Sequence, residues 1–391
     1  MSIYQNVLTR WLADAGIHVN GRQAHDIQIH DPRFYRRALL HGSLGFGESY
    51  MEGWWSCPDL EELIYRLIRS DVRRRAYKHP GAVALEWLNR IRNDQNRARS
   101  LRAPRRHYDL DNELFGAFLG GYRNYSCGYY NGACGLDEAQ RLKLDLICRK
   151  LCLRPGEHLL DVGGGWGEFA LYAAKNYGAR VTSVNISEEQ MRYAREHCAG
   201  FDVDVVRCDY RDLKGRFDKI AAIAMFPHVG HRNHRTFMET MHRALKPDGV
   251  LLIETTVNSV STTAGDPWID RYIFPGLLMP SGVQILTAME GLFATEDVHN
   301  FGPHYVRTLR DWNANFQSSC CDFLGRHQEP VRRMFEYFFL VSAALFRART
   351  MQYWHLVATR QGDPQPACRV SAVDCRIPQA ETAREYAEVR R

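Results

Sequence analysis

The sequence contains no uninterrupted apolar run of the length that a membrane-spanning helix needs, about 20 residues. It contains no CxxC pair, so we expect no structural zinc site and no bound metal. The first residues, Met1 to Gln5, do not form the basic and apolar start of a secretory signal peptide. The 11 cysteines are odd in number and irregularly spaced, which argues against a disulfide framework. These absences predict a cytoplasmic protein with reduced thiols.

Length and composition predict a folded protein of more than one domain. The 391 residues exceed a typical single domain, and 45% of them are hydrophobic, which is ample for a core. Charges of the two signs nearly balance, with 51 Lys and Arg against 45 Asp and Glu and a net charge of +6. No internal repeat is visible in the chain.

The most informative feature present is a glycine-rich turn after an apolar segment. Leu159 to Val162 has the pattern of a buried strand, and Gly163, Gly165 and Gly167 alternate after it. Glycine permits a sharp turn and close approach to a ligand, and the helix expected from about Glu168 to Tyr177 presents free N–H groups at its start. The spacing is tighter than the GxGxxG fingerprint, and no P-loop Lys-Ser/Thr follows. The pattern favours S-adenosylmethionine over NAD or ATP, although a tight strand-to-helix connection alone uses the same glycines.

Further strands and helices alternate along the same region. Val181 to Ser187 carries a second strand, a third ends before Arg207, Phe217 opens a fourth, and Val250 to Thr255 forms a fifth. This alternation predicts an α/β fold with a doubly wound parallel sheet, whose ligands bind outside the carboxyl ends of the strands. It is the Rossmann-like pattern of a class I methyltransferase, and we expect a smaller, mainly helical N-terminal domain before it.

Several short segments occur in a fixed order that is typical of one enzyme family. They are Leu44 to Trp55, His107 to Leu110, Tyr125 to Tyr129, Met225 to Gly230, Asp266 to Ile269, Tyr272 to Pro275 and His299 to Gly302. In these segments the chain resembles the cyclopropane-fatty-acyl-phospholipid synthases, in their bacterial two-domain form, and the related mycolic acid cyclopropane synthases. The resemblance extends from about residue 5 to residue 360, which is far more specific than the glycine turn alone.

The resemblance implies an S-adenosylmethionine-dependent methyltransferase that converts an unactivated alkene of an acyl chain to a cyclopropane. The alkene would attack the sulfonium methyl, and the resulting cation would lose a proton from the delivered methyl to close the ring. Aromatic faces stabilise such a cation, and aromatic residues are frequent after the core strands. Among them, Tyr305 matches the family's active-site tyrosine.

The residues expected to bind the cofactor follow from the strand ends and from the resemblance. They are Gly163 and Gly165 beside the methionine and ribose, Asn185 and Gln190 after the second strand, Tyr210 and Arg211 beside the adenine, Ile223 along the base, and Tyr125 and Ser126 over the sulfonium. Two of these positions have ordinary structural alternatives. Gln190 can be an exposed helix position, and Tyr210 can be a packing residue.

The resemblance also implies that a bicarbonate ion accepts the proton, held by a cysteine, a glutamate, a histidine and the tyrosine. Cys127 and Tyr305 match this set, and His228 is a further catalytic candidate in the Phe-x-His segment. Pro227, however, occupies the glutamate position, and Glu254 occupies the histidine position. Proline has no side-chain acceptor and no N–H, so two of the family's contacts to bicarbonate are altered.

Glu254 offers a compensation for these changes. It lies at the carboxyl end of a strand, where active-site groups gather, and a fixed anion there would repel bicarbonate. Glu254 would then be the base itself, or would stabilise the cation, and an apolar pocket would raise its pKa toward a useful range. The alternatives are a Glu254 that bonds to a loop or the cofactor without transferring protons, and a Cys127 that only packs.

The expected domain organisation has four parts. They are a helical lipid-recruitment domain at 1–92, a basic linker at 93–106, the methyltransferase domain with a helical acyl-binding insertion at 107–361, and a flexible tail at 362–391. From Arg66 to Arg106, basic residues far outnumber acidic ones and apolar residues lie between them. Such a segment can bind anionic lipid headgroups. A solvated helix face followed by a linker is the alternative.

The expected substrate and partner is an unsaturated acyl lipid or a related alkene, with peripheral contact to the membrane. No nucleic acid is expected, and the oligomeric state, a homodimer included, stays open. Two other function classes remain. One is a C-methyltransferase of the same fold that gives a methyl-branched or methylene product on a lipid or specialised metabolite. The other is a non-catalytic lipid-binding protein, against which the intact glycines and the segment Tyr125 to Cys127 argue.

We predict that the protein binds vesicles containing anionic lipid and that this binding weakens with added salt. Exposed charges interact over a Debye length of only about 8 Å at physiological ionic strength, so further salt screens the basic segment. Vesicle co-sedimentation across a salt series measures the effect, with neutral vesicles as the control. Equal binding to neutral and anionic vesicles at every salt concentration would mean that the basic segment is only a solvated surface.

Overall fold

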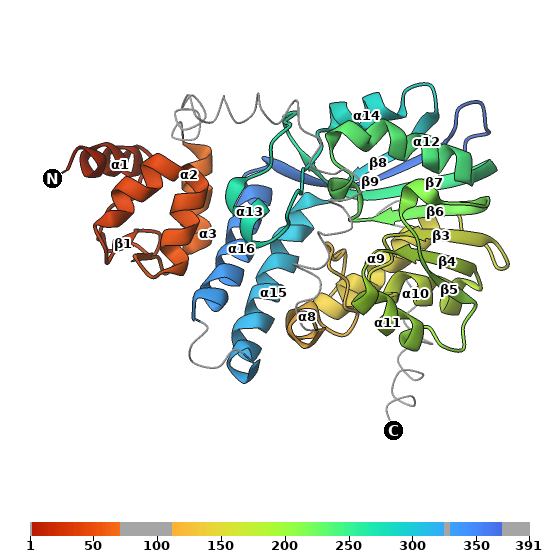
Figure 1. Ribbon diagram of the computed structural model, residues 1–391, viewed down its shortest axis with the longest axis horizontal. Coiled ribbons are helices and arrows are strands. Elements are labelled where there is room, and N and C mark those ends of the chain that lie inside the picture. Colours follow the sequence, from red (N-terminus) through yellow and green to blue (C-terminus); the bar gives the residue numbers. More distant parts are fainter. Residues whose placement is uncertain (1, 71–111, 324–328, 370–391) are drawn as a thin grey trace.

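The computed structural model describes residues 2–70, 112–323 and 329–369. The predicted linker at 93–106, most of the basic segment from Arg66 to Arg106, and the tail from residue 370 lie outside the described residues. The described chain forms two parts in Figure 1, a group of N-terminal helices and a larger α/β part, which two long helices, α15 and α16, connect.

The α/β part is built on one seven-stranded sheet with the order β5-β4-β3-β6-β7-β9-β8. Its strands are β3 (His158–Val162), β4 (Arg180–Asn185), β5 (Val203–Arg207), β6 (Phe217–Ile223), β7 (Leu245–Asn258), β8 (Phe293–Asn300) and β9 (Met351–Arg360). The first five run parallel, and β9 is antiparallel to both β7 and β8. The predicted doubly wound α/β fold is therefore confirmed, with two antiparallel strands added at one edge.

Helices cover both faces of this sheet because neighbouring residues of each strand point to opposite sides. Leu159 of β3 packs in a core cluster with α9 (Leu136–Lys150) and α10 (Glu168–Tyr177). Leu160, the next residue, packs in a second cluster with α12 (His234–Ala244) and α14 (Gly282–Met289). A strand buried on both faces has a continuous apolar sequence, as the segment before the glycine turn does.

The predicted elements of the sheet region are confirmed, with one difference in length. The helix expected from Glu168 to Tyr177 has those bounds, and α11 (Glu188–His197) follows β4. The fifth strand is longer than Val250 to Thr255 at both ends. Leu245 pairs with Phe217 of β6, and β9 pairs with the strand as far as Asn258, beyond the end of β6. The short helices between strands are η1 (Tyr210–Asp212), η2 (Phe226–His228) and η3 (His231–Asn233).

The N-terminal region is mainly helical, as expected. It contains α1 (Ile3–Asp14), α2 (Arg33–Met51), α3 (Leu60–Arg69) and a two-stranded sheet of β1 (Gln28–Ile29) and β2 (Trp55–Ser56). Asp59 begins α3 as its N-cap, since its side chain accepts a hydrogen bond from the Glu62 N–H.

The N-terminal helices pack directly against the helices that the α/β part adds after β7 and β8. These are α13 (Pro267–Tyr272), α15 (Gly302–Phe323) and α16 (Glu329–Arg347), and α8 (Asn112–Leu119) lies beside α15. Core residues of α1 to α3 and of these helices belong to one hydrophobic cluster. Gly47 of α2 lies so close to Trp268 that a Cβ there would come within 2.5 Å of the indole. Gly47, in the Leu44 to Trp55 segment, is thus required by the contact with Trp268.

Polar contacts add to this interface. The Tyr50 hydroxyl donates to Glu336 Oε2 at 2.9 Å, and the Arg333 guanidinium donates to the main-chain carbonyl oxygens of Tyr50 and Trp55. Glu61 of α3 accepts two hydrogen bonds of 2.7 Å from Arg310 of α15. The N-terminal region is therefore held by side-chain pairing as well as by apolar burial.

The first residues of the expected tail are fixed against the sheet. Cys368 is buried in the cluster with α9 and α10, the Gln365 amide donates to Glu296, and Asp363 accepts a hydrogen bond from the Asp248 N–H. These residues of the expected tail therefore cover apolar and polar groups at the edge of the sheet, and the flexibility of the tail stays a prediction.

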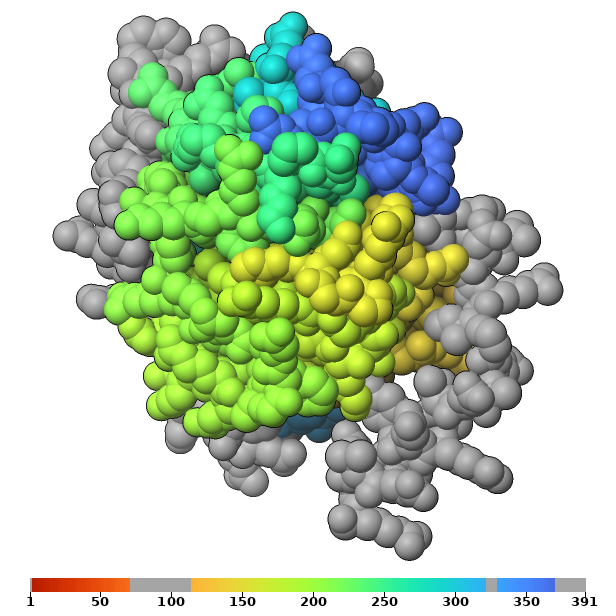
Figure 2. All heavy atoms as spheres, turned by 90° about the vertical axis from the view of Figure 1, so that its right-hand side faces the viewer, coloured from red at the N-terminus to blue at the C-terminus, as the bar shows by residue number. Residues whose placement is uncertain are grey.

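None of the helices in the described ranges combines the length and apolarity that a bilayer crossing requires. Figure 2 shows the face that lies on the right-hand side of Figure 1, and the sheet region forms it. The N-terminal helices, red in Figure 1, do not reach this face.

We predict that Glu61→Ala lowers the free energy of unfolding by about 1–2 kcal/mol, since charged hydrogen bonds at a nearly buried carboxylate are lost. The Glu61 side chain is 8% exposed, whereas its partner Arg310 is 54% exposed. Solvent around Arg310 weakens the pair, so the expected loss of unfolding free energy lies at the low end for a buried carboxylate. Chemical denaturation followed by tryptophan fluorescence measures the change. Glu239→Ala is the matched control, because its ion pair with Arg235 is exposed on both sides and is worth about 0.5 kcal/mol or less. An equal effect of both substitutions would show that Glu61 does not hold the N-terminal helices.

Candidate active site

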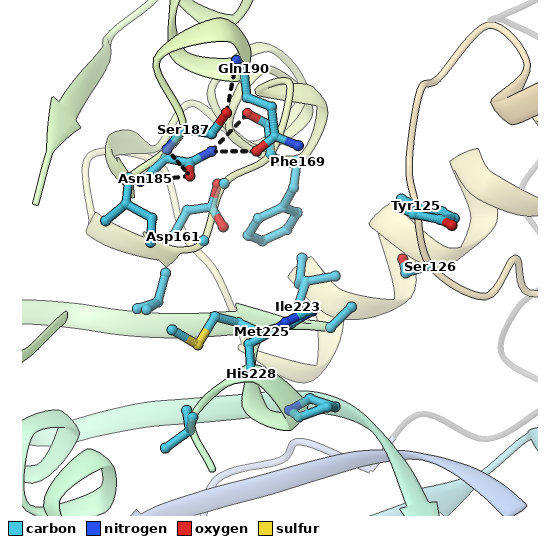
Figure 3. Close-up of a pocket in the computed structure, with 18 of the residues that line it drawn as sticks. Tyr125, Ser126, Asp161, Phe169, Asn185, Ser187, Gln190, Ile223, Met225 and His228 are labelled. Atoms are coloured by element: carbon cyan, nitrogen blue, oxygen red, sulfur yellow. Dashed lines mark hydrogen bonds between the residues drawn. The ribbon is translucent and has the colours of Figure 1, made fainter. Parts of the chain in front are cut away.

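A cavity of about 260 Å³ lies at the carboxyl ends of β3, β4, β5 and β6. Its lining residues come from the turns after these four parallel strands, from the segment Arg123 to Ser126, and from the aromatic region after β7. Figure 3 shows the polar side chains of the β4 end on one side and Tyr125 and Ser126 on another. The cavity is where a doubly wound sheet places its ligand.

The glycine turn forms the floor of this cavity and has a backbone that other residues rarely adopt. Gly163, Gly165 and Gly167 have φ values of 83°, 54° and 89°, in the left-handed region. Gly164 is required for a different reason, since a Cβ there would come within 1.8 Å of the Ser183 hydroxyl oxygen. The alternating glycines predicted as a ligand-binding turn thus line the cavity at 163 and 165, with the main chain exposed to it.

The end of β4 presents a hydrogen-bonded pair of amide side chains. Asn185 Nδ2 donates to Gln190 Oε1 at 3.0 Å, and Asn185 Oδ1 accepts from the N–H groups of Ile186 and Ser187. Ser187 is the N-cap of α11. Gln190 is 6% exposed and lines the cavity, so its alternative as an exposed helix position is wrong.

The turn after β5 supplies the next part of the wall. The Arg211 guanidinium is held by Asp209 through contacts of 2.8 Å and 2.6 Å, and both residues line the cavity. The buried Tyr210 packs its ring on Phe237 at 5.2 Å. Its hydroxyl makes no hydrogen bond within the described residues. Ile223, at the end of β6, adds an apolar surface to the same cavity.

Asp161 lies at the cavity floor and has an unusual environment. Its carboxylate is 1% exposed and accepts a hydrogen bond from the Ser183 hydroxyl at 3.0 Å. Burial raises the pKa of Asp161 to about 7, against the opposing effects of Ser183 and Lys143. Asp161 lies within the expected strand Leu159 to Val162, and the apolar pattern of that strand gave no reason to expect it at a cavity.

Aromatic rings form the far wall of the cavity. Tyr125, Phe274, Tyr305 and Tyr353 line it, and Trp312 lies behind them. The Tyr305 ring is 4.8 Å from the Tyr353 ring, and Tyr125 is 5.6 Å from Phe274. Tyr305, expected in the site, is therefore present there, and Tyr353 is an addition that the sequence pattern did not indicate.

His228 also lines the cavity, at the end of η2. Its ring contacts Phe274 edge-on at 5.8 Å. Burial lowers the pKa of His228 to about 4, so the imidazole is neutral at physiological pH. Pro227 is buried next to it and has no polar side-chain atom to offer this side of the cavity.

Cys127 and Ser126 are both buried, but only Ser126 lines the cavity. The Ser126 hydroxyl accepts a hydrogen bond of 2.7 Å from the ammonium group of Lys143. Burial raises the pKa of the Cys127 thiol well above its ordinary value, and the nearby Glu254 carboxylate acts in the same direction. Cys127 is therefore a neutral thiol behind the cavity wall.

Glu254 lies behind the same wall, in a buried cluster with Lys143, Tyr353 and His355, hereafter the Glu254 cluster. Its Oε1 accepts from the Tyr353 hydroxyl at 2.7 Å and lies 3.9 Å from Lys143 Nζ, and its Oε2 is 2.6 Å from His355 Nε2. All four side chains are at most 1% exposed. Tyr353 is the member of this cluster that lines the cavity.

The expected rise in the pKa of Glu254 is wrong. Burial acts in that direction, but Lys143, His355 and Tyr353 outweigh it and lower the pKa of Glu254 to about 2. The surroundings are polar and positively charged rather than apolar, because α9 places a lysine over the strand. Glu254 is therefore a buried carboxylate anion.

The arrangement fits S-adenosylmethionine, the ligand that the glycine pattern favours. One cavity is bordered by a main-chain turn with open space at Gly165, by an amide pair at Asn185 and Gln190, and by polar atoms of Tyr210 and Asn124 that have no hydrogen-bond partner in the part of the chain that the structure describes. Within the described ranges, no group of three His, Cys, Asp or Glu side chains is arranged to hold a metal ion.

The sequence patterns did not point to Lys143, Tyr353 or His355. Lys143 stands between Leu142 and Leu144 in a helix whose face is largely buried, and a lysine in such a position is the only signal that was available. The pairing of β9 with β7 brings Tyr353 and His355 to the site from about 100 residues away, and no local pattern marks that contact.

Comparisons with known proteins identify the family of this chain. The family described as mycolic acid cyclopropane synthetase matches residues 95–356. Cyclopropane-fatty-acyl-phospholipid synthase of Escherichia coli (strain K12) is 40% identical over 357 residues, which cover 91% of this chain and 94% of that protein. Tuberculostearic acid methyltransferase UfaA1 of Mycobacterium tuberculosis (strain ATCC 25618 / H37Rv) is 32% identical over 370 residues, which cover 88% of this chain and 85% of that protein. The structure of mycolic acid cyclopropane synthase CmaA1 complexed with SAH and CTAB superposes with a TM-score of 0.62 at 28% identity, covering 67% of this chain and 98% of that one.

We predict that Gly165→Leu abolishes measurable binding of S-adenosylhomocysteine. The side chain would enter the open space beside the turn, and the left-handed backbone costs a non-glycine residue about 1–2 kcal/mol. Titration calorimetry measures the affinity. Gly200→Leu is the matched control, because Gly200 also has a positive φ and open space but does not line the cavity. Wild-type affinity in Gly165→Leu would place the cofactor elsewhere.

Proposed function

The chain belongs to the mycolic acid cyclopropane synthetase family, and we propose on this basis that it adds a methylene group to an unactivated alkene of a phospholipid acyl chain, forming a cyclopropane. It is an S-adenosylmethionine-dependent methyltransferase of the cyclopropane fatty acid synthase family. When bound, S-adenosylmethionine supplies an electrophilic methyl group on a sulfonium. The residues of this chain must then hold the alkene against that methyl, stabilise a cation and remove a proton.

The observation that carries the proposal is the aromatic wall of the cavity. An alkene that takes up a methyl group becomes a carbocation, and aromatic faces attract cations while excluding water. Tyr125, Phe274, Tyr305 and Tyr353 line the cavity together, within one space that also contains the glycine turn. A methyltransferase for a nitrogen or oxygen nucleophile has no need of such a wall, because its product forms without a carbon-centred cation.

The proposed cofactor contacts are those the strand ends provide. Gly163 and Gly165 approach the methionine and ribose, and Asn185 and Gln190 form the hydrogen-bonding edge after β4. Tyr210, Arg211 and Ile223 border the base, and Tyr125 and Ser126 border the sulfonium. Support comes from their shared cavity and from the SAH-bound structure of CmaA1.

The proposed catalytic groups differ in their access to the substrate. Tyr305 and His228 line the cavity and would contact the alkene or the cation, whereas Cys127 acts only from behind the wall. The neutral imidazole of His228 is able to accept a hydrogen bond or a proton. We do not assign bicarbonate to this chain, because Pro227 and Glu254 replace two of the expected contacts, and Glu254 is a buried anion where the family has a histidine.

A second candidate function is C-methylation that gives a methyl-branched or methylene product. Two observations favour keeping it. Pro227 provides no carboxylate beside the cavity, and the relative UfaA1, whose name describes a tuberculostearic acid methyltransferase, covers 88% of this chain. The two functions share every step up to the cation. A methyl-branched product forms when a chain carbon loses the proton, whereas a methylene product forms when the delivered methyl loses it after a hydride shift, without ring closure.

We also propose that the protein binds membranes peripherally, through its N-terminal region. On α1, Ile3 and Val7 lie one turn apart and are 74% and 37% exposed, on the side away from the buried Leu8 and Leu12. An exposed apolar pair beside basic residues such as Arg10 suits the boundary of headgroups and acyl chains.

We predict that expression in a cell lacking such enzymes, fed with methyl-deuterated methionine, yields acyl chains that have gained one methylene group with two deuteriums. Ring closure removes one hydrogen of the delivered methyl, so one deuterium is lost. A methyl-branched product formed by losing a chain hydrogen retains three deuteriums, and fragmentation separates a ring from a methylene product. Mass spectrometry of the lipids reads all three outcomes. Unlabelled lipids in cells that contain the soluble protein would contradict the proposed function.

A further inference from the structure

The Glu254 cluster brings a buried carboxylate within one hydrogen bond of the cavity. In the antiparallel pair of β7 and β9, His355 lies directly opposite Glu254, and Tyr353 lies opposite Thr256. Residues two apart on a strand share a face of the sheet, so Tyr353 and His355 flank the Glu254 carboxylate from the same side. Lys143 of α9 lies over the same carboxylate.

The carboxylate has no direct access to a substrate. Glu254 is 0% exposed and does not line the cavity, and both of its oxygens are engaged by Tyr353 and His355. The Tyr353 ring borders the cavity, and its hydroxyl donates to Glu254 Oε1. The ring is also 4.8 Å from that of Tyr305, so it belongs to the aromatic wall.

We propose that Tyr353 is a catalytic residue that takes the proton released on ring closure and passes its own hydroxyl proton to Glu254. This inference rests on the proposed function, since it names the proton acceptor of that reaction. Tyr353 would contact the reacting methyl group, whereas Glu254, Lys143 and His355 act through it and are positioning residues.

The step balances without any further reactant. A C–H bond of the delivered methyl breaks, and its electron pair forms the new C–C bond to the cationic carbon. The proton goes to the Tyr353 oxygen, while the original hydroxyl proton of Tyr353 goes to Glu254 Oε1. The carboxylate becomes neutral and the cation disappears, so charge is conserved. After the product leaves and water enters the cavity, the proton returns by the same two oxygens.

The low pKa of Glu254 does not prevent this role. A proton on the methyl group next to a carbocation is strongly acidic, so a weakly basic carboxylate suffices as its acceptor. Because Glu254 is ionised at physiological pH, it can accept a proton without first having to lose one. A carboxylate fixed at this depth disfavours a second anion nearby, so the relay and a bicarbonate base exclude each other.

His355 and Lys143 keep the acceptor in place. His355 Nε2 lies 2.6 Å from Oε2, and its other ring nitrogen, Nδ1, makes no hydrogen bond within the described residues. A neutral ring with its proton on Nε2 accounts for both facts, and burial lowers the pKa of His355 in agreement. Lys143 offsets the buried negative charge, and its own Nζ is held at 2.7 Å by Ser126.

The test is Tyr353→Phe, assayed as purified protein with methyl-deuterated S-adenosylmethionine and unsaturated phospholipid vesicles in bicarbonate-depleted buffer. We expect ring-forming turnover to fall by about a hundredfold, the usual contribution of a positioned proton acceptor. The remaining product should shift from two toward three deuteriums, because the cation then loses a chain hydrogen. Affinity for S-adenosylhomocysteine should stay at the wild-type value. A purely structural role of Tyr353 does not change the deuterium count.

Thr359→Val is the matched control. Thr359, on the same strand, donates a 2.7 Å hydrogen bond to another buried carboxylate, Glu296, away from the cavity. We expect wild-type turnover and wild-type products. Glu254→Gln is the second variant, with the same product shift expected if it still binds S-adenosylhomocysteine. Because this change leaves Lys143 without its buried counter-charge and can destabilise the fold, loss of activity in Glu254→Gln without binding of S-adenosylhomocysteine is not counted, and Tyr353→Phe is the principal variant.

Three results would overturn the relay. The first is a wild-type rate and deuterium count in Tyr353→Phe. The second is a wild-type enzyme that needs added bicarbonate. The third is a His228→Gln variant that no longer closes the ring while Tyr353→Phe still does. The proposed function fails separately, if the wild-type enzyme transfers no labelled methyl group to the lipid either with or without added bicarbonate. A wild-type enzyme that forms the ring, with a Tyr353→Phe variant that does not, supports both.

Discussion

The site depends on one constraint of the fold, which is that parallel strands end at the same edge of the sheet. The turns after β3, β4, β5 and β6 therefore meet at a single cavity, although they are separated in sequence by a helix each. Hydrogen bonding fixes the register of these strands, so the glycine turn, Asn185 and Ile223 cannot move independently. The groups at these strand ends therefore owe their place to the sheet rather than to a local motif.

The sequence is most informative where one strand and its following turn contain a whole functional unit. The apolar segment at 159–162, the glycines and the helix from Glu168 could be predicted because each depends on its own neighbours. The same holds for Asn185 and Gln190, which are close in the chain. The Glu254 surroundings could not be predicted, because they arise from the late strand β9 and from α9, and neither contact leaves a local pattern. An isolated glutamate among apolar neighbours suggests a raised pKa, and the opposite direction follows only once Lys143 is in place.

The aromatic wall and the Glu254 cluster are suited to charges of opposite sign, and Tyr353 belongs to both. The wall offers a cation the faces of aromatic rings, whereas the cluster keeps a full negative charge out of water by surrounding it with three partners. A buried ion pair such as Lys143 with Glu254 rarely increases stability over an apolar pair, and removing one member costs about 3–5 kcal/mol. A catalytic role therefore explains the buried pair of Lys143 and Glu254 better than a gain in stability does.

The way the N-terminal helices are attached has a consequence for evolution. The face of α16 that meets α2 carries Tyr337, whose ring is 5.6 Å from Tyr50, and Arg333, which caps main-chain carbonyls of the N-terminal region. A relative built on the same sheet but without these helices would expose that face to water. Gain or loss of the N-terminal region therefore has to be accompanied by substitutions along α16 and α13. The boundary between the two parts is thus a set of residues that must change together, and it cannot be treated as a point at which a domain is simply added.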